Sequence, residues 1–91
     1  MGFILKICGT LIKNNKIIKE EIVASDIEGS YQDNLKACIA EICYKMDISK
    51  PYWLPMNVNA YNERRKTIFT DNNFIDEKGF DKFVIEELDF N

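Results

Sequence analysis

Histidine is absent from this 91-residue chain, which removes the commonest general base and the commonest metal ligand of proteins. The four glycines are scattered, so the glycine-rich loops that hold nucleotide phosphates cannot form. We therefore expect a protein without a cofactor or a bound metal, and we expect it not to be an enzyme.

Cysteine is scarce and long apolar runs are missing. The three cysteines are an odd number, which favours a reducing compartment over a disulfide framework. No stretch approaches the roughly 18 uninterrupted apolar residues of a membrane span. Lys6 also interrupts the first apolar run too early for a secretory signal. The expectation is a cytoplasmic protein that does not cross a membrane.

The remaining composition is that of a folded domain. Hydrophobic residues make up 46% of the chain and charged residues 30%, with both signs interspersed, which excludes disordered and fibrous classes. Residues 1–91 should form a single domain with one thin core. The net charge of −3 weighs against general nucleic-acid binding, because affinity for phosphates requires concentrated lysine and arginine.

Alternating apolar and polar residues predict a β-hairpin at the start of the chain. Residues 3–12 and 17–24 alternate around Asn14-Asn15, a dipeptide that tolerates the positive φ of a two-residue turn. Pairing Lys13 with Lys16 sets the register. The predicted core face consists of Phe3, Leu5, Ile7, Leu11, Ile18, Ile22 and Ala24. The opposite face holds Ile4, Lys6, Cys8, Thr10, Ile12, Ile17, Lys19, Glu21 and Val23.

Glu20 does not fit this pattern, because the register places it on the core face opposite Gly9. A bulge at Gly9 that redirects the neighbouring side chains is the preferred explanation. A functional buried carboxylate is the alternative.

A long helix follows, over residues 31–46. Ser30 and Asp33 resemble a capping box at its start. The apolar positions recur with helical spacing and span an arc of about 140°: Tyr31, Leu35, Cys38, Ile39, Ile42, Cys43 and Met46. Ala37, Ala40 and Tyr44 gather on the opposite side, where lysine and glutamate are usual, so this side is a candidate contact surface.

The second half of the chain predicts short elements. Pro51 ends the helical region, Asn57 is a good N-cap for a short helix over 58–65, residues 66–70 suggest a short strand, and residues 81–88 a final strand. The acidic side chains Glu86, Glu87 and Asp89 are expected to protect a sheet edge from aggregation. The alternative is that they mimic a polyanion toward a basic partner. The predicted fold is α+β: two layers, with an antiparallel sheet of about four strands and one main helix on one face.

The sequence resembles a family of small uncharacterised bacterial proteins. The most specific residues run from the end of the long helix into the proline connection: Ile42-Cys43-Tyr44, Asp47, Lys50-Pro51, Trp53-Leu54 and Asn57. Further likeness lies in Asp71 to Glu77, Phe80-Asp81 and Ile85-Glu86, although this chain has one extra residue between Asp71 and Phe74. The resemblance implies a stand-alone cytoplasmic protein and supplies no catalytic residues.

The three cysteines do not form an obvious chemical site. Cys38 and Cys43 lie about 140° apart on one helix, whereas structural zinc needs closer spacing and four converging ligands, so both are interpreted as buried structural thiols. Cys8 falls on the more exposed hairpin face. Without a histidine to activate it, a reactive thiol there is the minor alternative.

The favoured hypothesis for function is a non-enzymatic interaction protein that binds an unknown protein partner or a second copy of itself. Contiguous exposed apolar area usually marks such an interface. The candidate surface is composed of Ile4, Ile12, Ile17, Val23, Ala37, Ala40 and Tyr44.

The alternative hypothesis is a nucleic-acid-binding or regulatory module. It uses the one basic cluster of the chain, in which cations contact phosphate while nearby aromatic rings stack on bases. The candidate contacts are Tyr61, Arg64, Arg65 and Lys66.

Overall fold

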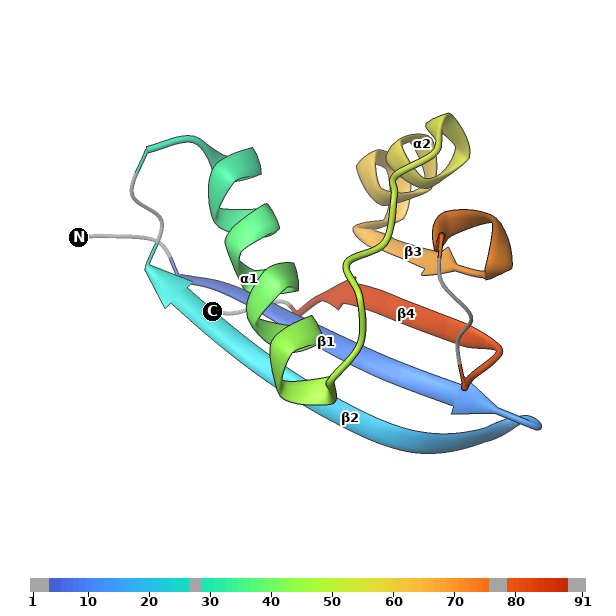
Figure 1. Ribbon diagram of the computed structural model, residues 1–91. Coiled ribbons are helices and arrows are strands. Elements are labelled where there is room, and N and C mark those ends of the chain that lie inside the picture. The colour runs from blue at the N-terminus through green and yellow to red at the C-terminus, as the bar shows by residue number, and fades with distance from the viewer. Residues whose placement is uncertain (1–3, 27–28, 76–78, 89–91) are drawn as a thin grey trace.

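The computed structural model describes residues 4–26, 29–75 and 79–88. They form β1 (Ile4–Lys13), β2 (Lys16–Asp26), α1 (Tyr31–Met46), α2 (Pro55–Arg64), β3 (Lys66–Phe69), the 3₁₀ helix η1 (Asp71–Asn73) and β4 (Lys82–Glu87). The four strands make one antiparallel sheet in the order β2-β1-β4-β3. Both helices lie on the same face of this sheet (Figure 1). The predicted α+β fold is confirmed, with a second helix beside the main one.

The hairpin turn forms as predicted, but the faces of β2 do not. Asn14 and Asn15 have φ of 52° and 64°, and Lys13 pairs with Lys16. Leu11 then pairs with Lys19 while Ile12 pairs with Ile17, which leaves Ile18 as an extra residue in β2. Because side chains alternate along a strand, one inserted residue exchanges the two faces beyond it.

Several predictions for β2 are therefore wrong. Val23, which was expected on the exposed face, is 4% exposed and belongs to the core. Three residues expected in the core are exposed instead: Ile18, Ile22 and Ala24. Phe3, also expected there, lies outside the described residues.

The same bulge explains Glu20. It pairs with Thr10 on the face away from the helices, where the Thr10 hydroxyl donates to its carboxylate at 3.5 Å. The bulge exists, but at Ile18 and not at Gly9, and Glu20 is exposed. It is not a buried functional carboxylate.

Gly9 does not form a bulge; it allows α1 to pack closely against the sheet at this position. A Cβ at this position would lie 2.5 Å from Cγ2 of Ile42 and 3.1 Å from Cε1 of Phe83. The predicted apolar stripe of α1 packs here, with Leu35, Cys38, Ile39, Ile42, Cys43 and Met46 all buried. The missing side chain of Gly9 thus sets the distance between helix and sheet.

α1 ends at Met46, several residues before Pro51, the residue that was predicted to end it. Asp47 adopts a left-handed conformation with φ of 57°, and the Ile48 amide donates to the Cys43 carbonyl at 3.0 Å. The Lys19 ammonium donates to the Met46 carbonyl at 3.0 Å, a favourable place for a cation at a helix C-terminus. The helix therefore ends through its own capping geometry, and Pro51 follows in the connection.

Two buried amide side chains join the α1–α2 connection to the rest of the chain. Asn57 lies inside α2, not at its N-cap, and accepts from the Leu54 amide at 3.0 Å. Its amide group donates to the Thr67 hydroxyl and the Ile68 carbonyl, both at 3.0 Å. Asn73 donates to Asn57 Oδ1 at 2.7 Å and to the Tyr52 carbonyl at 2.7 Å. This amide network attaches α2 to β3 and η1.

β4 occupies the interior of the sheet, between β1 and β3. Glu86 pairs with Cys8 on one side and with Lys66 on the other. The prediction that the acidic residues of this strand protect an edge is wrong for Glu86 and Glu87, because β2 and β3 are the edge strands. Asp89 lies outside the described residues.

Candidate functional site

The face of the sheet opposite the helices is the first candidate site, and we call it the open face. Its residues follow from the strand register, because they alternate with the buried ones. Its apolar members are Ile4, Cys8, Ile12, Ile17, Ile22, Ala24, Ile68 and Val84. No described helix crosses this face (Figure 1). Ile4, Ile17, Ile22 and Ile68 are between 44% and 63% exposed.

The predicted interaction residues divide between two sides of the molecule. Ile4, Ile12 and Ile17 lie on the open face, whereas Val23 lies under α1 in the core. Ala37, Ala40 and Tyr44 are on the side of α1 that points away from the sheet, and Tyr44 is 86% exposed. The candidate surface from the sequence therefore combines residues of the open face with residues on the far side of α1. These two surfaces lie on opposite sides of the molecule and cannot bind the same partner surface.

A groove between α1 and α2, which we call the helix groove, is the second candidate site. It encloses about 480 Å³. Residues at helical spacing on both helices form its sides, and the connection between the helices closes it. The contributing residues include Tyr31, Leu35 and Lys36 from α1, Pro51, Tyr52 and Trp53 from the connection, and Val58, Tyr61 and Arg65 from α2 or its end.

The aromatic wall of the helix groove is held by the core beneath it. Trp53 meets Tyr61 edge-to-face with ring centroids 5.8 Å apart, and meets Phe69 in the same manner at 5.1 Å. Such pairs add about 0.5–1.5 kcal/mol beyond the area they bury. Trp53 therefore has a fixed orientation at the groove.

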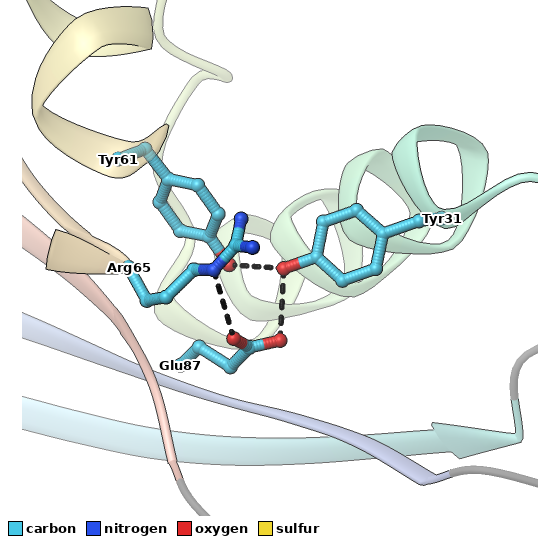
Figure 2. A network of polar contacts seen from close by, with 4 residues as sticks. All are labelled: Tyr31, Tyr61, Arg65 and Glu87. Carbon is cyan, nitrogen blue, oxygen red and sulfur yellow. Dashed lines mark hydrogen bonds and ion pairs between the residues drawn. The ribbon is translucent and has the colours of Figure 1, made fainter. Parts of the chain in front are cut away.

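A polar network lies at one end of the helix groove, where Tyr31, Tyr61, Arg65 and Glu87 converge (Figure 2). The Tyr31 hydroxyl donates to Glu87 Oε1 at 2.8 Å and lies 2.9 Å from the Tyr61 hydroxyl. Since Tyr31 uses its one proton on Glu87, Tyr61 must be the donor to Tyr31. Arg65 Nε lies 3.7 Å from Glu87 Oε2, and its guanidinium carbon lies 5.7 Å from the centre of the Tyr31 ring.

Burial keeps both hydroxyls of this network protonated. Burial is the largest cause that raises the pKa of Tyr61, and the Tyr31 hydroxyl and the Glu87 charge raise it further. Burial also raises the pKa of Tyr31, with Glu87 adding to the effect. Neither tyrosine ionises near neutral pH, and each donates its one proton inside the network, so the two hydroxyls hold Glu87 in place and do not transfer protons.

The structure separates the residues predicted to contact nucleic acid. Tyr61 is 3% exposed and its hydroxyl is committed to the network. Arg65 borders the helix groove, whereas Lys66 is on the open face, where it pairs with Glu86. Arg64 is exposed and does not line the groove. The cations therefore do not form one basic surface.

Tyr31 and Glu87 are the members of the network that the sequence did not indicate. They are 56 positions apart, and no motif links them. A helix-start tyrosine and an acid in the last strand are ordinary in sequence, so only the strand order β2-β1-β4-β3 brings them together.

The thiols lie as the sequence predicts. Cys38 and Cys43 are buried, and Cys8 is half-buried on the open face. Burial raises the pKa of Cys43 to about 11. In residues 4–26, 29–75 and 79–88, no group of three cysteine or acidic residues is placed to hold a metal ion.

We expect Cys8 to react slowly with iodoacetamide at pH 8 in the folded protein. Burial raises the pKa of this thiol, and the charges of Glu20 and Glu86 raise it further, whereas the hydrogen bond between Cys8 and Thr10 lowers it. A raised pKa lowers the fraction of reactive thiolate. Mass spectrometry of dilute protein should therefore show slower alkylation of Cys8 in the folded protein than in the protein unfolded in urea. Glu86→Gln should speed the reaction. An unchanged rate in that variant would show that the charge of Glu86 does not raise the pKa of Cys8.

No protein-family model, curated protein or solved structure matches this chain. Among the described residues, none of the helices is sufficiently long and apolar to span a membrane.

Proposed function

We propose that this protein is a non-enzymatic interaction protein that pairs with a second copy of itself through the open face. The observation that carries the proposal is the position of both helices on one side of the sheet, which leaves isoleucines on the other side about half exposed. Antiparallel sheets often have one solvated face, but that face is usually polar. Here apolar residues extend across all four strands.

The apolar residues of the open face form an apolar band of neighbouring pairs, with charged residues among them. Ile22 pairs with Cys8, and Ile12 pairs with Ile17. Val84 pairs with Thr10 on one side and with Ile68 on the other. Contiguous apolar surface of this kind marks protein contacts more often than isolated apolar residues do.

The charges around this band suit a second copy. The open face carries three bases and three acids by register: Lys6, Lys66, Lys82, Glu20, Asp26 and Glu86. A face without net charge does not repel itself, and a two-fold pair can place acids opposite bases.

The size of the face suits a dimer of moderate strength. The four strands have 10, 11, 4 and 6 residues. At about 3.4 Å per residue and a spacing of about 4.8 Å, they give a footprint on the order of 500 Å² per copy. This is below the roughly 800 Å² per partner of standard stable complexes. We therefore expect a dissociation constant in the micromolar range, roughly −8 kcal/mol.

Sedimentation of the protein across a concentration series should show a reversible monomer–dimer equilibrium. Ile68→Lys, which places a charge in the apolar band, should weaken the dimer more than about tenfold. Tyr44→Lys is the matched control, since it adds the same charge at the more exposed position on the far side of α1. It should leave the dimer intact.

Two results would overturn the proposal. One is a single-protomer mass at every concentration up to about 1 mM, well above the expected dissociation constant. The other is a dimer that Tyr44→Lys dissociates while Ile68→Lys does not, which would assign the contact to the back of α1.

We also propose that the protein is cytoplasmic and that it is not an enzyme. Cys8, Cys38 and Cys43 are free thiols, which suits a reducing compartment such as the cytoplasm. The tyrosine hydroxyls of the polar network donate to each other and to Glu87, which leaves neither proton for catalysis. We also propose that the protein belongs to the family of small bacterial proteins that its sequence resembles.

A further inference from the structure

The helix groove has the character of a site for a small ligand, independent of the open face. Its volume of about 480 Å³ lies within the roughly 300–1,000 Å³ of small-molecule sites. Leu35, Pro51, Trp53 and Val58 supply apolar wall, and a few polar side chains also line the groove. This is the usual composition of a pocket that binds a mainly apolar molecule with one polar group.

The charge at the groove is positive. Lys36 on α1 and Arg65 at the end of α2 both line it, and no acid does. The whole chain has a net charge of −3, so this pair of cations is a local departure from the average. An anionic group between them would gain two charge-assisted hydrogen-bond partners.

Glu87 forms an ion pair with Arg65 and offsets part of its charge, so the site stays positive only because Lys36 lines it as well. Its Oε1 accepts the Tyr31 hydroxyl, and its Oε2 lies by Nε of Arg65. The two terminal nitrogens of Arg65 are turned away from Glu87 in Figure 2, and among the described residues no hydrogen bond to them occurs. The network therefore orients the guanidinium and leaves its paired donors for a ligand, in the fork geometry that fits a carboxylate.

We propose that the helix groove binds a small aromatic carboxylic acid. The carboxylate lies between Arg65 and Lys36, and the flat ring lies against Trp53 and Val58. The ring of Trp53, which Tyr61 and Phe69 hold in place, favours a planar apolar body over a flexible chain, because a fixed aromatic wall binds a flat face at little entropic cost. The Tyr31 hydroxyl acts as a positioning group, since it holds Glu87 and through it Arg65.

Titration with 2-naphthoate tests this site directly. Trp53 is the only tryptophan, so its indole N–H gives one signal in ¹H–¹⁵N NMR that reports on the groove. We expect a saturable shift of that signal. Two matched compounds serve as controls: 2-naphthamide has the ring without the charge, and acetate has the charge without the ring. Both should bind more weakly by about tenfold or more.

Variants identify the cations. Lys36→Gln and Arg65→Gln should each weaken 2-naphthoate about five- to tenfold and leave 2-naphthamide unchanged. Arg64→Gln removes the same charge one residue away, outside the groove, and should have no effect. Lys36 is exposed on α1, so its variant tests the site even if Arg65→Gln disturbs the network.

Equal binding of 2-naphthamide and 2-naphthoate, or no shift of the Trp53 signal, would overturn the carboxylate site. Tighter binding of adenosine monophosphate than of 2-naphthoate would overturn it in favour of a nucleotide. These results are separate from the dimer test, because Ile68→Lys alters the opposite face of the sheet and should not change naphthoate binding.

Discussion

Replacing Asn57 with alanine should lower the free energy of unfolding by about 4 kcal/mol, the largest effect we expect from a single polar side chain. Asn57 is 2% exposed and fills its whole hydrogen-bonding capacity. Its removal leaves the Leu54 amide, the Ile68 carbonyl and the Asn73 amide group without these partners inside the protein. Each such loss costs about 1–3 kcal/mol. Urea denaturation at one fixed protein concentration measures the change.

Two further variants sharpen this test. Asn59→Ala, at an exposed position of the same helix, should change stability by less than about 0.5 kcal/mol. Asn57→Asp preserves the shape but loses both donors and buries a charge, so it should also destabilise strongly, and less so at low pH where the carboxyl is neutral. A mild effect of Asn57→Ala would show that water replaces the lost bonds.

Replacing Gly9 with valine should destabilise the protein by about 3 kcal/mol, and Gly9→Ala by about half as much. The new Cβ would overlap Cγ2 of Ile42. Either α1 must move away from the sheet, or the Ile42 side chain must leave its preferred rotamer. Thermal or urea denaturation detects the loss.

A double-mutant cycle identifies the clash. Ile42→Leu moves the branch of the side chain away from Cβ, so Gly9→Ala should cost less by about 1 kcal/mol in that background. Gly79→Ala is the matched control, because a Cβ there meets nothing within 4 Å. If the cost of Gly9→Ala were the same in both backgrounds, the contact with Ile42 would not be its cause.

Sequence periodicity predicted the elements whose cause is local. The stripe of α1 and the Asn14-Asn15 turn both depend on residues within a few positions of each other. The faces of β2 were wrong beyond one residue, because the bulge at Ile18 depends on how β2 meets β1 and leaves no mark in the alternating pattern. Val23 and Ile22 exchanged places for that reason alone.

The candidate sites were predictable only in part. Arg65 and Tyr61 were named for their charge and ring, yet their contacts with Glu87 and Tyr31 span up to 56 positions. The three adjacent cations seemed one cluster in the sequence, but the turn from α2 into β3 directs Lys66 to the other side of the sheet. Asn57 was expected to cap a helix, and its role in the buried amide network needed Asn73 on a distant loop.

The interior position of β4 also affects how the protein is made. The hairpin of β1 and β2 is complete by Asp26, but β1 has no neighbour on its second side until residues 82–87 are synthesised. Until then the nascent chain presents an open strand edge, which other chains can pair with. Closing the sheet late requires contacts between distant segments, which form slowly. During synthesis the chain therefore has an open edge on β1 that β4 covers in the finished sheet.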